Sequence, residues 1–340
     1  MFKIIHMKQR NIRKRVVRLL PLFLSFGLVF LMFCYISTSL RSVICNVKPL
    51  LLYKTTGDKV FLQELNMQQQ CTGCFPESIH LIIDNDQICK PSNVSIDILI
   101  MIMSSPQNKL SRNAIRDTWL KHTKTNKGNI RYVFLLGDSS MTNELEKENL
   151  KTNDIILGSF KDTYNNLTYK TLMSFQWAAK HCRNAQFVMK TDDDVYVHIP
   201  GLKRVIKENA KALQTAVGGY CQQVANPVRD KESKWYASFE SYPQTTYPGY
   251  CSGTGYVTSL NVVTHIVKIS KIVPFFHLED VYIALCIQKL GFCLHSLKGF
   301  MLAYDLDNCK NHDNTLVTIH KVSVSMLRRI WEIPCTFNLV

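Results

Sequence analysis

The chain reads FVMKTDDDVYV from residue 187 to residue 197, so three adjacent carboxylates, Asp192, Asp193 and Asp194, stand between two apolar runs. Aspartates are unfavourable in strands and repel one another, so a buried strand that ends in three of them needs a reason. Mg²⁺ or Mn²⁺ takes oxygen ligands, and one or two carboxylates together with substrate phosphates commonly hold such an ion. We therefore expect a metal ion and a diphosphate at the carboxyl end of this strand, where open α/β sheets bind ligands. The alternative is a solvated acidic turn.

Apolar runs alternate with helical patterns before the triplet. The runs Ile96–Met103 and Tyr132–Leu136, and a shorter one at Asp154–Gly158, are typical of strands buried on both faces. Helices are predicted over Arg112–His122 with Ser111 as the cap, over Asn143–Asn153, and over a stretch that ends near Cys182. This alternation predicts an α/β fold, with a Rossmann-type sheet flanked by helices, whose first half binds a nucleotide and ends at the triplet.

Further elements are predicted after the triplet. Two segments have the pattern of strands, Ala216–Cys221 and Gly255–Ser259. Four have the pattern of helices, Gly201–Lys211, Val262–Ile272, Glu279–Leu290 and Val322–Trp331.

The first forty residues have the composition of a membrane anchor. Seven basic residues and no acidic residue stand before residue 19. Leu19–Ile36 is almost wholly apolar, and Ser37–Leu40 can extend it to the length of a membrane span whose basic flank is cytosolic. A signal peptide cleaved near Ser37–Ser39 is the alternative. We expect a cytosolic basic tail at 1–18, a transmembrane signal-anchor at 19–40, a lumenal stem at 41–94 and a folded domain at 95–340.

The distribution of charge argues against a nucleic-acid partner. The net charge is +15, but the basic tail supplies seven of these charges and leaves +8 for more than 300 residues. That mild excess suits an anionic small substrate or a membrane surface.

Cysteines and glycosylation sequons agree with a lumenal domain. Eleven of the twelve cysteines follow the apolar segment, in a compartment that permits disulfides. Cys71 and Cys74 form a CxxC pair, but no second pair stands at the spacing of a zinc finger, which argues against zinc. Asn93 and Asn166 begin matches to the N-glycosylation sequon.

Six motifs in order along the chain resemble the β-1,3-galactosyltransferase family, within the β-1,3-glycosyltransferases. They are Arg112–Trp119, Phe134–Gly137, Asp162–Thr171, Met189–Asp194, Tyr250–Tyr256 and Glu279–Tyr282. The matches run from about residue 96 to 332, so the resemblance makes 95–340 a catalytic glycosyltransferase domain. It implies a GT-A-like fold with a mixed sheet, a nucleotide-sugar donor, Mn²⁺ and a single-pass type II anchor in the Golgi membrane.

The resemblance assigns the metal site. Asp194 would be the direct Mn²⁺ ligand, Asp192 would lie near the metal or the ribose, and His320 would complete the metal shell. The metal would neutralise the departing diphosphate as a Lewis acid. A lone histidine is as often a surface or core residue, and that alternative stays open for His320.

The resemblance also assigns the base. A β-linked product from an α-linked UDP-sugar requires inversion, hence in-line attack and one group that takes the proton of the acceptor hydroxyl. Asp280 matches that base. The alternative is a plain acidic residue stabilised by the N-terminus of its helix.

Donor and acceptor contacts are predicted around these residues. Donor-binding residues are Arg112, Arg116, Asp162, Lys170, Lys190 and Asp193. Acceptor-binding residues are Trp235, Tyr236, Tyr242, Gly253, Thr254, Gly255 and Glu279. Arginines four apart on one helix face also suit salt bridges, and aromatic residues at this density are as often part of a core.

The resemblance implies inverting, metal-dependent transfer of galactose from UDP-galactose to a hydroxyl of a glycan on protein or lipid, forming a β-1,3 linkage. Lys190-Thr191 and Cys251–Gly255 resemble galactosyl members, whereas N-acetylglucosaminyl members tend to show more glycine there. A β-1,3-N-acetylglucosaminyltransferase that uses UDP-GlcNAc is the alternative enzyme. A lumenal sugar-binding protein of the same fold is the alternative outside catalysis.

Overall fold

The computed structural model describes residues 43–45, 74–75, 79–138, 142–303 and 315–332. The chain divides into two compact units, Met1–Val43 and Ile44–Val340, and the second contains the fold described below. The predicted cytosolic tail and signal-anchor, residues 1–40, lie outside the described residues. Within the described ranges, no helix has both the length and the apolar character needed to cross a membrane.

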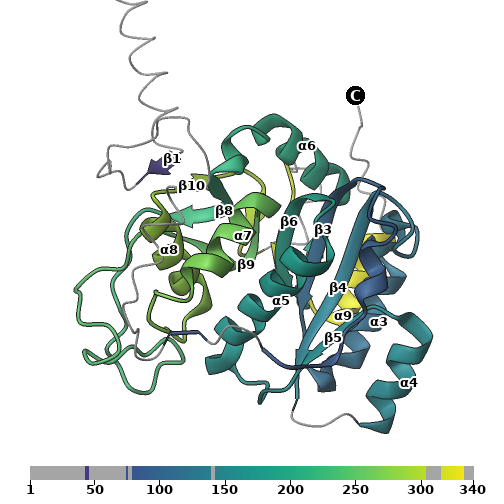
Figure 1. The fold of residues 1–340 in the computed structure, drawn as a ribbon, viewed down its shortest axis with the longest axis horizontal. Helices are drawn as coiled ribbons and strands as arrows, with labels where there is room; N and C mark the ends of the chain where they lie inside the picture. The colour runs from purple at the N-terminus through teal and green to yellow at the C-terminus, as the bar shows by residue number, and fades with distance from the viewer. Residues whose placement is uncertain (1–42, 46–73, 76–78, 139–141, 304–314, 333–340) are drawn as a thin grey trace, which may run out of the picture. The chain divides into compact units, whose positions relative to one another are not determined.

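A nine-stranded mixed sheet forms the centre of the fold, with helices on both faces (Figure 1). Its order is β2 (Leu81–Ile83), β5 (Ile155–Gly158), β4 (Ile130–Gly137), β3 (Ile96–Met103), β6 (Ala185–Asp192), β9 (Tyr250–Ser259), β8 (Ala216–Gln222), β10 (Cys293–Ser296) and β1 (Val43–Cys45). Strands β3 to β6 are parallel, while β9 runs antiparallel to both of its neighbours. The predicted α/β fold with a mixed, helix-flanked sheet is therefore confirmed.

The central strands are buried on both faces, as their continuous apolar runs predict. Along β3, Leu99 and Met101 face one hydrophobic cluster, whereas Ile98 and Ile100 face another, as the period of two in a strand requires. The first cluster contains residues of α5 (Leu167–His181), α7 (Leu260–Ile269) and α8 (Glu279–Leu290). The second contains residues of α3 (Lys109–Asp117), α4 (Asn143–Thr152), α6 (Ile199–Asn209) and α9 (Val324–Glu332).

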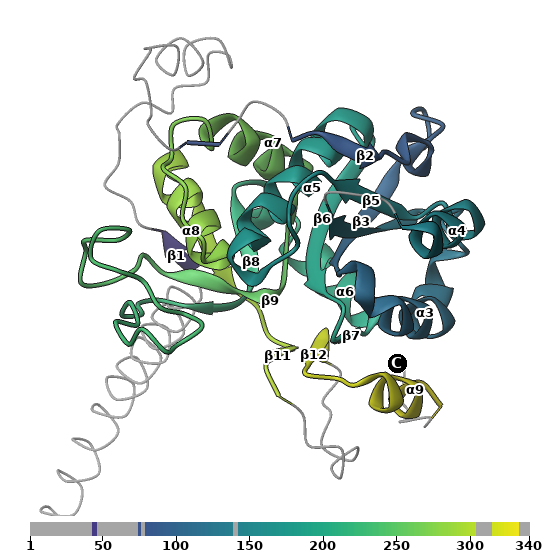
Figure 2. The same ribbon diagram turned by 90° about the horizontal axis from the view of Figure 1, so that it is seen from below.

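A second, three-stranded sheet lies after the acidic triplet. It consists of β11 (Phe300–Met301), β12 (Thr318–His320) and β7 (Val195–Val197), and β12 pairs antiparallel with β7. The following helix α9 packs against α3, which comes some 200 residues earlier in the sequence (Figure 2). This arrangement brings the C-terminal part of the described chain beside the triplet.

Two predicted helix boundaries are wrong for identifiable reasons. The helix predicted over Arg112–His122 begins earlier, at Lys109, so Ser111 lies inside its first turn and is not its cap. The helix is interrupted at Thr118, whose hydroxyl donates to the carbonyl of Ala114, and a 3₁₀ segment follows at Trp119–Thr123. A side chain that bonds to the preceding turn competes with the helix and bends it.

An edge strand and one disulfide extend the fold upstream of residue 95. Strand β2 pairs with β5 at the edge of the sheet, so part of the predicted stem belongs to the folded unit. Disulfides join Cys89 to Cys182 and Cys221 to Cys251. Among the described residues, Cys286 is a free, buried thiol. The two cross-links agree with an oxidising compartment.

Candidate active site

Polar side chains converge at the carboxyl ends of the parallel strands. Met103, the last residue of β3, pairs with Asp192 at the end of β6, so Ser104 and the triplet leave the sheet side by side. Asp162 follows the neighbouring strand β5, and its carboxylate accepts from the backbone N–H of Gly137 at the end of β4 (3.0 Å). Open α/β sheets bind their ligands at this edge.

The three aspartates of the triplet have different partners. Asp192 accepts from Nζ of Lys190 at 2.7 Å, and Asp193 accepts from Oγ of Ser104 at 2.6 Å and from Nδ2 of Asn108 at 2.9 Å. Burial and the adjacent carboxylates raise the pKa of Asp193. The triplet is therefore not a solvated acidic turn, because two of its carboxylates bond to groups of the fold.

Asp194 is the carboxylate open to a ligand. Its side chain is 50% exposed, and its Oδ2 lies 3.3 Å from Nε2 of His320, which the pairing of β12 with β7 places opposite Val195. Burial raises the pKa of Asp194, but its hydrogen bond to His320 and the charge of His320 outweigh burial and lower it. The carboxylate is thus ionised at neutral pH.

The residues beside Asp194 fit a divalent cation held partly by substrate. Across the described part of the chain, no group of three or more His, Cys, Asp or Glu side chains forms a metal cage. Asp194 and His320 supply one carboxylate and one imidazole nitrogen, and the arrangement leaves further positions for phosphate oxygens and water. Mg²⁺ and Mn²⁺ sites of nucleotide enzymes commonly have only one or two protein ligands and bind substrate phosphates as well.

The proposed base, Asp280, lies in the first turn of α8. Its Oδ1 accepts from the backbone N–H of Val281 at 2.9 Å, and its Oδ2 has a longer contact of 3.4 Å with the N–H of Gly253. Burial and the charge of the adjacent Glu279 raise the pKa of Asp280 to about 6. A partly exposed carboxylate with a pKa near neutrality suits general-base catalysis.

Two predicted donor-binding arginines have internal partners. Arg112 is fully buried and makes a bidentate pair with Glu148 at 2.8 and 2.7 Å. Arg116 bonds to Asp154 in the same way, at 2.9 and 2.8 Å, and also reaches Glu148 at 2.8 Å. This network joins α3 to α4 and β5, so the geometry favours the salt-bridging alternative for both residues.

Lys170 and Asp162, also predicted to bind the donor, form an ion pair at 2.6 Å beside the triplet. Lys170 in addition donates to the carbonyl of Ser104, which ties α5 to the end of β3. Burial lowers the pKa of Lys170, and the Asp162 carboxylate opposes that effect. The pair lies at the carboxyl ends of the parallel strands, and Asp162 is partly open to solvent.

The predicted acceptor-binding aromatic residues separate into two environments. Trp235 is 51% exposed, whereas Tyr242 is buried in a cluster of rings with Tyr247 and Phe276. The hydroxyl of Tyr242 donates to the carbonyl of Thr246, so this residue has the packing role that the sequence left open. Tyr236 is partly buried in the same loop, between β8 and β9.

Tyr164 is a site residue to which the sequence assigned no role. The ammonium of Lys234 lies 5.5 Å from the ring centroid of Tyr164 and 4.7 Å from that of Trp235. Burial and the negative charge of Asp280 raise the pKa of Tyr164 to about 12. In the sequence, the one indication of a role for Tyr164 is its position inside the motif Asp162–Thr171.

The glycine-containing run of β9 lies against β6. Thr191 pairs with Gly255, and its hydroxyl donates to the carbonyl of Thr254 at 3.1 Å. A Cβ at Gly253 would lie 2.8 Å from Oε2 of Glu279, whereas a Cβ at Gly255 would meet no atom closer than 3.5 Å. The Glu279 carboxylate can therefore occupy its observed position only with glycine at position 253, whereas position 255 has room for a Cβ.

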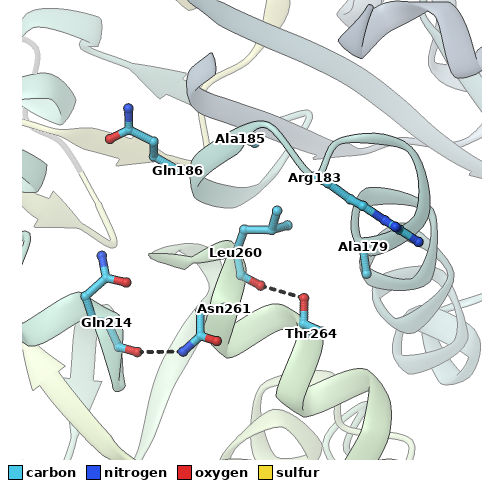
Figure 3. Close-up of a pocket in the computed structure, with 8 residues that line it drawn as sticks. All are labelled: Ala179, Arg183, Ala185, Gln186, Gln214, Leu260, Asn261 and Thr264. Atoms are coloured by element: carbon cyan, nitrogen blue, oxygen red, sulfur yellow. Dashed lines mark hydrogen bonds between the residues drawn. The ribbon is translucent and has the colours of Figure 1, made fainter. Parts of the chain in front are cut away.

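A surface pocket lies away from these residues. Figure 3 shows its lining, which consists of Ala179, Arg183, Ala185, Gln186, Gln214, Leu260, Asn261 and Thr264. Ala185 and Gln186 begin β6, whereas Asp192 ends it, so the pocket is roughly 20 Å from the triplet at about 3.3 Å per residue. The lining has no acidic side chain, and the pocket is not the candidate site.

The two sequons occupy different surroundings. Asn93 lies in an exposed turn before β3. Asn166 is partly buried at the N-terminus of α5, where its side chain donates to the carbonyl of Lys161 at 2.8 Å. Thr168 of the same sequon is buried and donates to the carbonyl of Phe276. Of the two asparagines, Asn93 is the more accessible in the folded protein.

Comparison with known proteins identifies the family of the chain. A family model described as Galactosyltransferase matches residues 110–298. The chain is 36% identical to beta-1,3-galactosyltransferase 1 of Mus musculus and of Homo sapiens over 265 residues, covering 76% of this chain and 79% of each relative. It is 38% identical to beta-1,3-galactosyltransferase 5 of Mus musculus over 196 residues, covering 57% and 63%.

Among solved structures, a glycosyltransferase involved in glycosylation of the PBCV-1 major capsid overlaps with a TM-score of 0.39 at 12% identity, covering 70% of this chain and all of that one. The family assignment rests on the sequence matches and not on this low structural overlap. The chain belongs to the galactosyltransferase family, and with relatives named beta-1,3-galactosyltransferases the protein is a hexosyltransferase.

Proposed function

We propose that the protein transfers galactose from UDP-galactose to a hydroxyl of a glycan on protein or lipid, with inversion and in a metal-dependent reaction that forms a β-1,3 linkage. The observation that carries the proposal is the position of Asp280, a carboxylate of raised pKa, across β9 from the acidic triplet. In this arrangement the donor phosphates lie toward Asp194 and His320, and the acceptor lies toward Asp280.

The chain's own residues have distinct tasks in this reaction. Oδ2 of Asp280 takes the proton of the acceptor hydroxyl as that oxygen attacks the anomeric carbon of the sugar. Asp194 and His320 would hold Mn²⁺, which when bound supplies positive charge to the departing UDP. Exposed Trp235 offers an apolar face on which an acceptor sugar can stack.

UDP-GlcNAc remains the alternative donor. Thr191, one of the residues that resemble galactosyl members, is fully buried and bonds to the backbone of Thr254. Any effect of Thr191 on donor choice would therefore be exerted through the position of β9 and not by contact with the sugar. This indirect influence supports galactose less strongly than a direct contact would.

Incubation of the full-length protein with UDP-galactose or UDP-GlcNAc and a panel of glycan acceptors tests the proposal. We expect galactosylated product, with a β-1,3 linkage visible by NMR spectroscopy, and at least tenfold less product from UDP-GlcNAc. A preference for UDP-GlcNAc would replace the proposed donor by the alternative. Absence of transfer from either donor to every acceptor would contradict the proposed activity.

A further inference from the structure

Lys190 is a charged residue in the interior of the site. It is 2% exposed, and its ammonium donates to Asp192 at 2.7 Å and to the carbonyl of Gly253, and lies 3.6 Å from Oε2 of Glu279. The ammonium thus lies between a carboxylate of the triplet and a carboxylate beside the base.

Glu279 completes this arrangement on the side of the base. It is 6% exposed, and its Oε1 accepts from the hydroxyl of Tyr256 at 2.7 Å. Burial and the Glu279 carboxylate raise the pKa of Tyr256, so the phenol keeps its proton and donates it to this bond. A carboxylate with these partners is turned inward, and its predicted contact with the acceptor does not follow from the geometry.

The peptide of Gly253 connects these groups to Asp280. Its carbonyl accepts from Lys190, while its N–H contacts Oδ2 of Asp280 at 3.4 Å. A side chain at this position would meet Glu279 at 2.8 Å, so glycine is required for the carboxylate to occupy its place. Polar contacts therefore connect Asp192 to Asp280 through Lys190 and the backbone of Gly253.

Stability alone does not account for a buried pair of charges, Lys190 and Glu279. Burying ions costs desolvation energy, and well-packed apolar side chains commonly give the same stability or more. The group lies instead between the metal-side carboxylate and the base-side carboxylate, where misplacement by about 1 Å can cost on the order of 10²-fold in rate.

We propose that Lys190, Glu279 and Tyr256, together called the Lys190 cluster, are positioning residues that hold the base Asp280 in place relative to Asp192 of the triplet. The inference rests on the proposed function in treating Asp280 as the base. It assigns Glu279 to the support of Asp280 and not to contact with the acceptor.

The test uses variants that keep the shape of the cluster. Tyr256→Phe removes only the hydroxyl that bonds to Glu279, and Glu279→Gln removes the charge beside the base. The titratable groups that face Asp280 are Glu279 on α8, Lys190 on β6, Tyr250 and Tyr256 on β9, Tyr247 before β9 and Tyr164 before α5. Among these, Glu279 is the one other carboxylate, so its removal should make Asp280 a weaker base.

In the full-length protein we expect Tyr256→Phe to lower kcat about tenfold, with the KM values of donor and acceptor within about twofold of wild type. Glu279→Gln should lower kcat and move the acid limb of its pH profile to lower pH. The matched control is Tyr282→Phe on α8, which removes a buried hydroxyl bonded to the carbonyls of Ser270 and Val273. This variant should change neither kcat nor the acid limb of its pH profile. The proposal would be overturned if Glu279→Gln raised the acceptor KM but left kcat and the acid limb of its pH profile unchanged.

A second measurement does not depend on activity. Asp280→Asn removes a charge that the Glu279 carboxylate disfavours, so its effect on Tm should be more stabilising at pH 7 than at pH 4. This gain in Tm should be smaller when Glu279→Gln is also present. Equal gains in both backgrounds would show that Glu279 does not act on Asp280 and would overturn the proposal. Unequal gains in a protein that transfers no sugar would contradict the proposed function alone, since they leave the link between the two carboxylates standing.

Discussion

At the scale of single residues, the proposed reaction uses two carboxylates whose pKa values are shifted in opposite directions. The hydrogen bond and charge of His320 lower the pKa of Asp194, against the effect of burial, whereas burial and Glu279 raise that of Asp280 to about 6. One carboxylate is thus suited to a metal ion, and the other to a proton. Neighbours that separate the titration of two similar groups are a common feature of active sites.

The pH dependence of the reaction should follow Asp280. The base must be unprotonated, so kcat/KM should rise as pH increases through about 6 and fall below it. A pH profile with saturating metal measures this limb. A limb that remains near the usual pKa of an exposed aspartate, about 3.9, would show that the base is another group.

Removal of the metal-side carboxylate should abolish most transfer without unfolding the domain. Asp194 is half exposed and stands in a row of like charges, so Asp194→Ala should change Tm by only a few degrees while kcat falls at least about 10²-fold. Chelation should also stop the wild-type reaction, and Mn²⁺ should restore it. The matched control is Asp117→Ala on α3, a more exposed acid far along the chain from the triplet. Full activity in excess chelator would contradict the metal role.

At the scale of elements, β9 brings the two halves of the site together. Its antiparallel pairing with β6 places Gly253 between Lys190 and Asp280, and α8 begins opposite it. The sequence predicted α8 with its observed bounds, Glu279–Leu290, because its first acidic residues and Gly291 mark both ends. It did not predict that Glu279 turns inward, because that depends on the register of β9 and on a tyrosine twenty-three residues away.

Alanine substitutions along β9 should differ sharply in their effect on stability. Gly253→Ala places a methyl group 2.8 Å from the Glu279 carboxylate, so it should lower the free energy of unfolding by about 1–3 kcal/mol, as overpacking does. Gly255→Ala meets ordinary contact distances and should change that free energy by less than about 1 kcal/mol. Chemical denaturation of both variants measures the difference. Equal effects would contradict the packing at Gly253.

At the scale of the whole molecule, a chain with a predicted N-terminal anchor presents an active site built from distant segments. The parallel strands and the triplet were predictable because their apolar runs are long and regular. The strands β10, β11 and β12 were not, because they are short and depend on contacts with the rest of the fold. The loop between β8 and β9 was not, because it has no regular hydrophobic period. The placement of His320 beside Asp194 depends on β12, so the sequence alone supported it only through family resemblance.

The orientation in the membrane stays a prediction from residues 1–40, which lie outside the described part of the structure. We expect residues 1–18 to be cytosolic and the catalytic domain to be lumenal, in agreement with its disulfides. Protease treatment of intact vesicles should leave the domain protected and remove an N-terminal tag. Digestion of the domain would contradict this topology, and secretion of a chain that begins near Ser39 would support the cleaved signal peptide.

The turnover and the donor affinity of Asp280→Asn test the account most directly. Asparagine keeps the shape of the side chain and is acceptable at the start of a helix, but it cannot accept the proton. Turnover should fall by about 10²–10⁴-fold, while affinity for UDP-galactose should stay within about twofold, because the donor contacts lie at the triplet. Near-wild-type turnover with intact donor binding would contradict the claim that Asp280 is the base of this transferase.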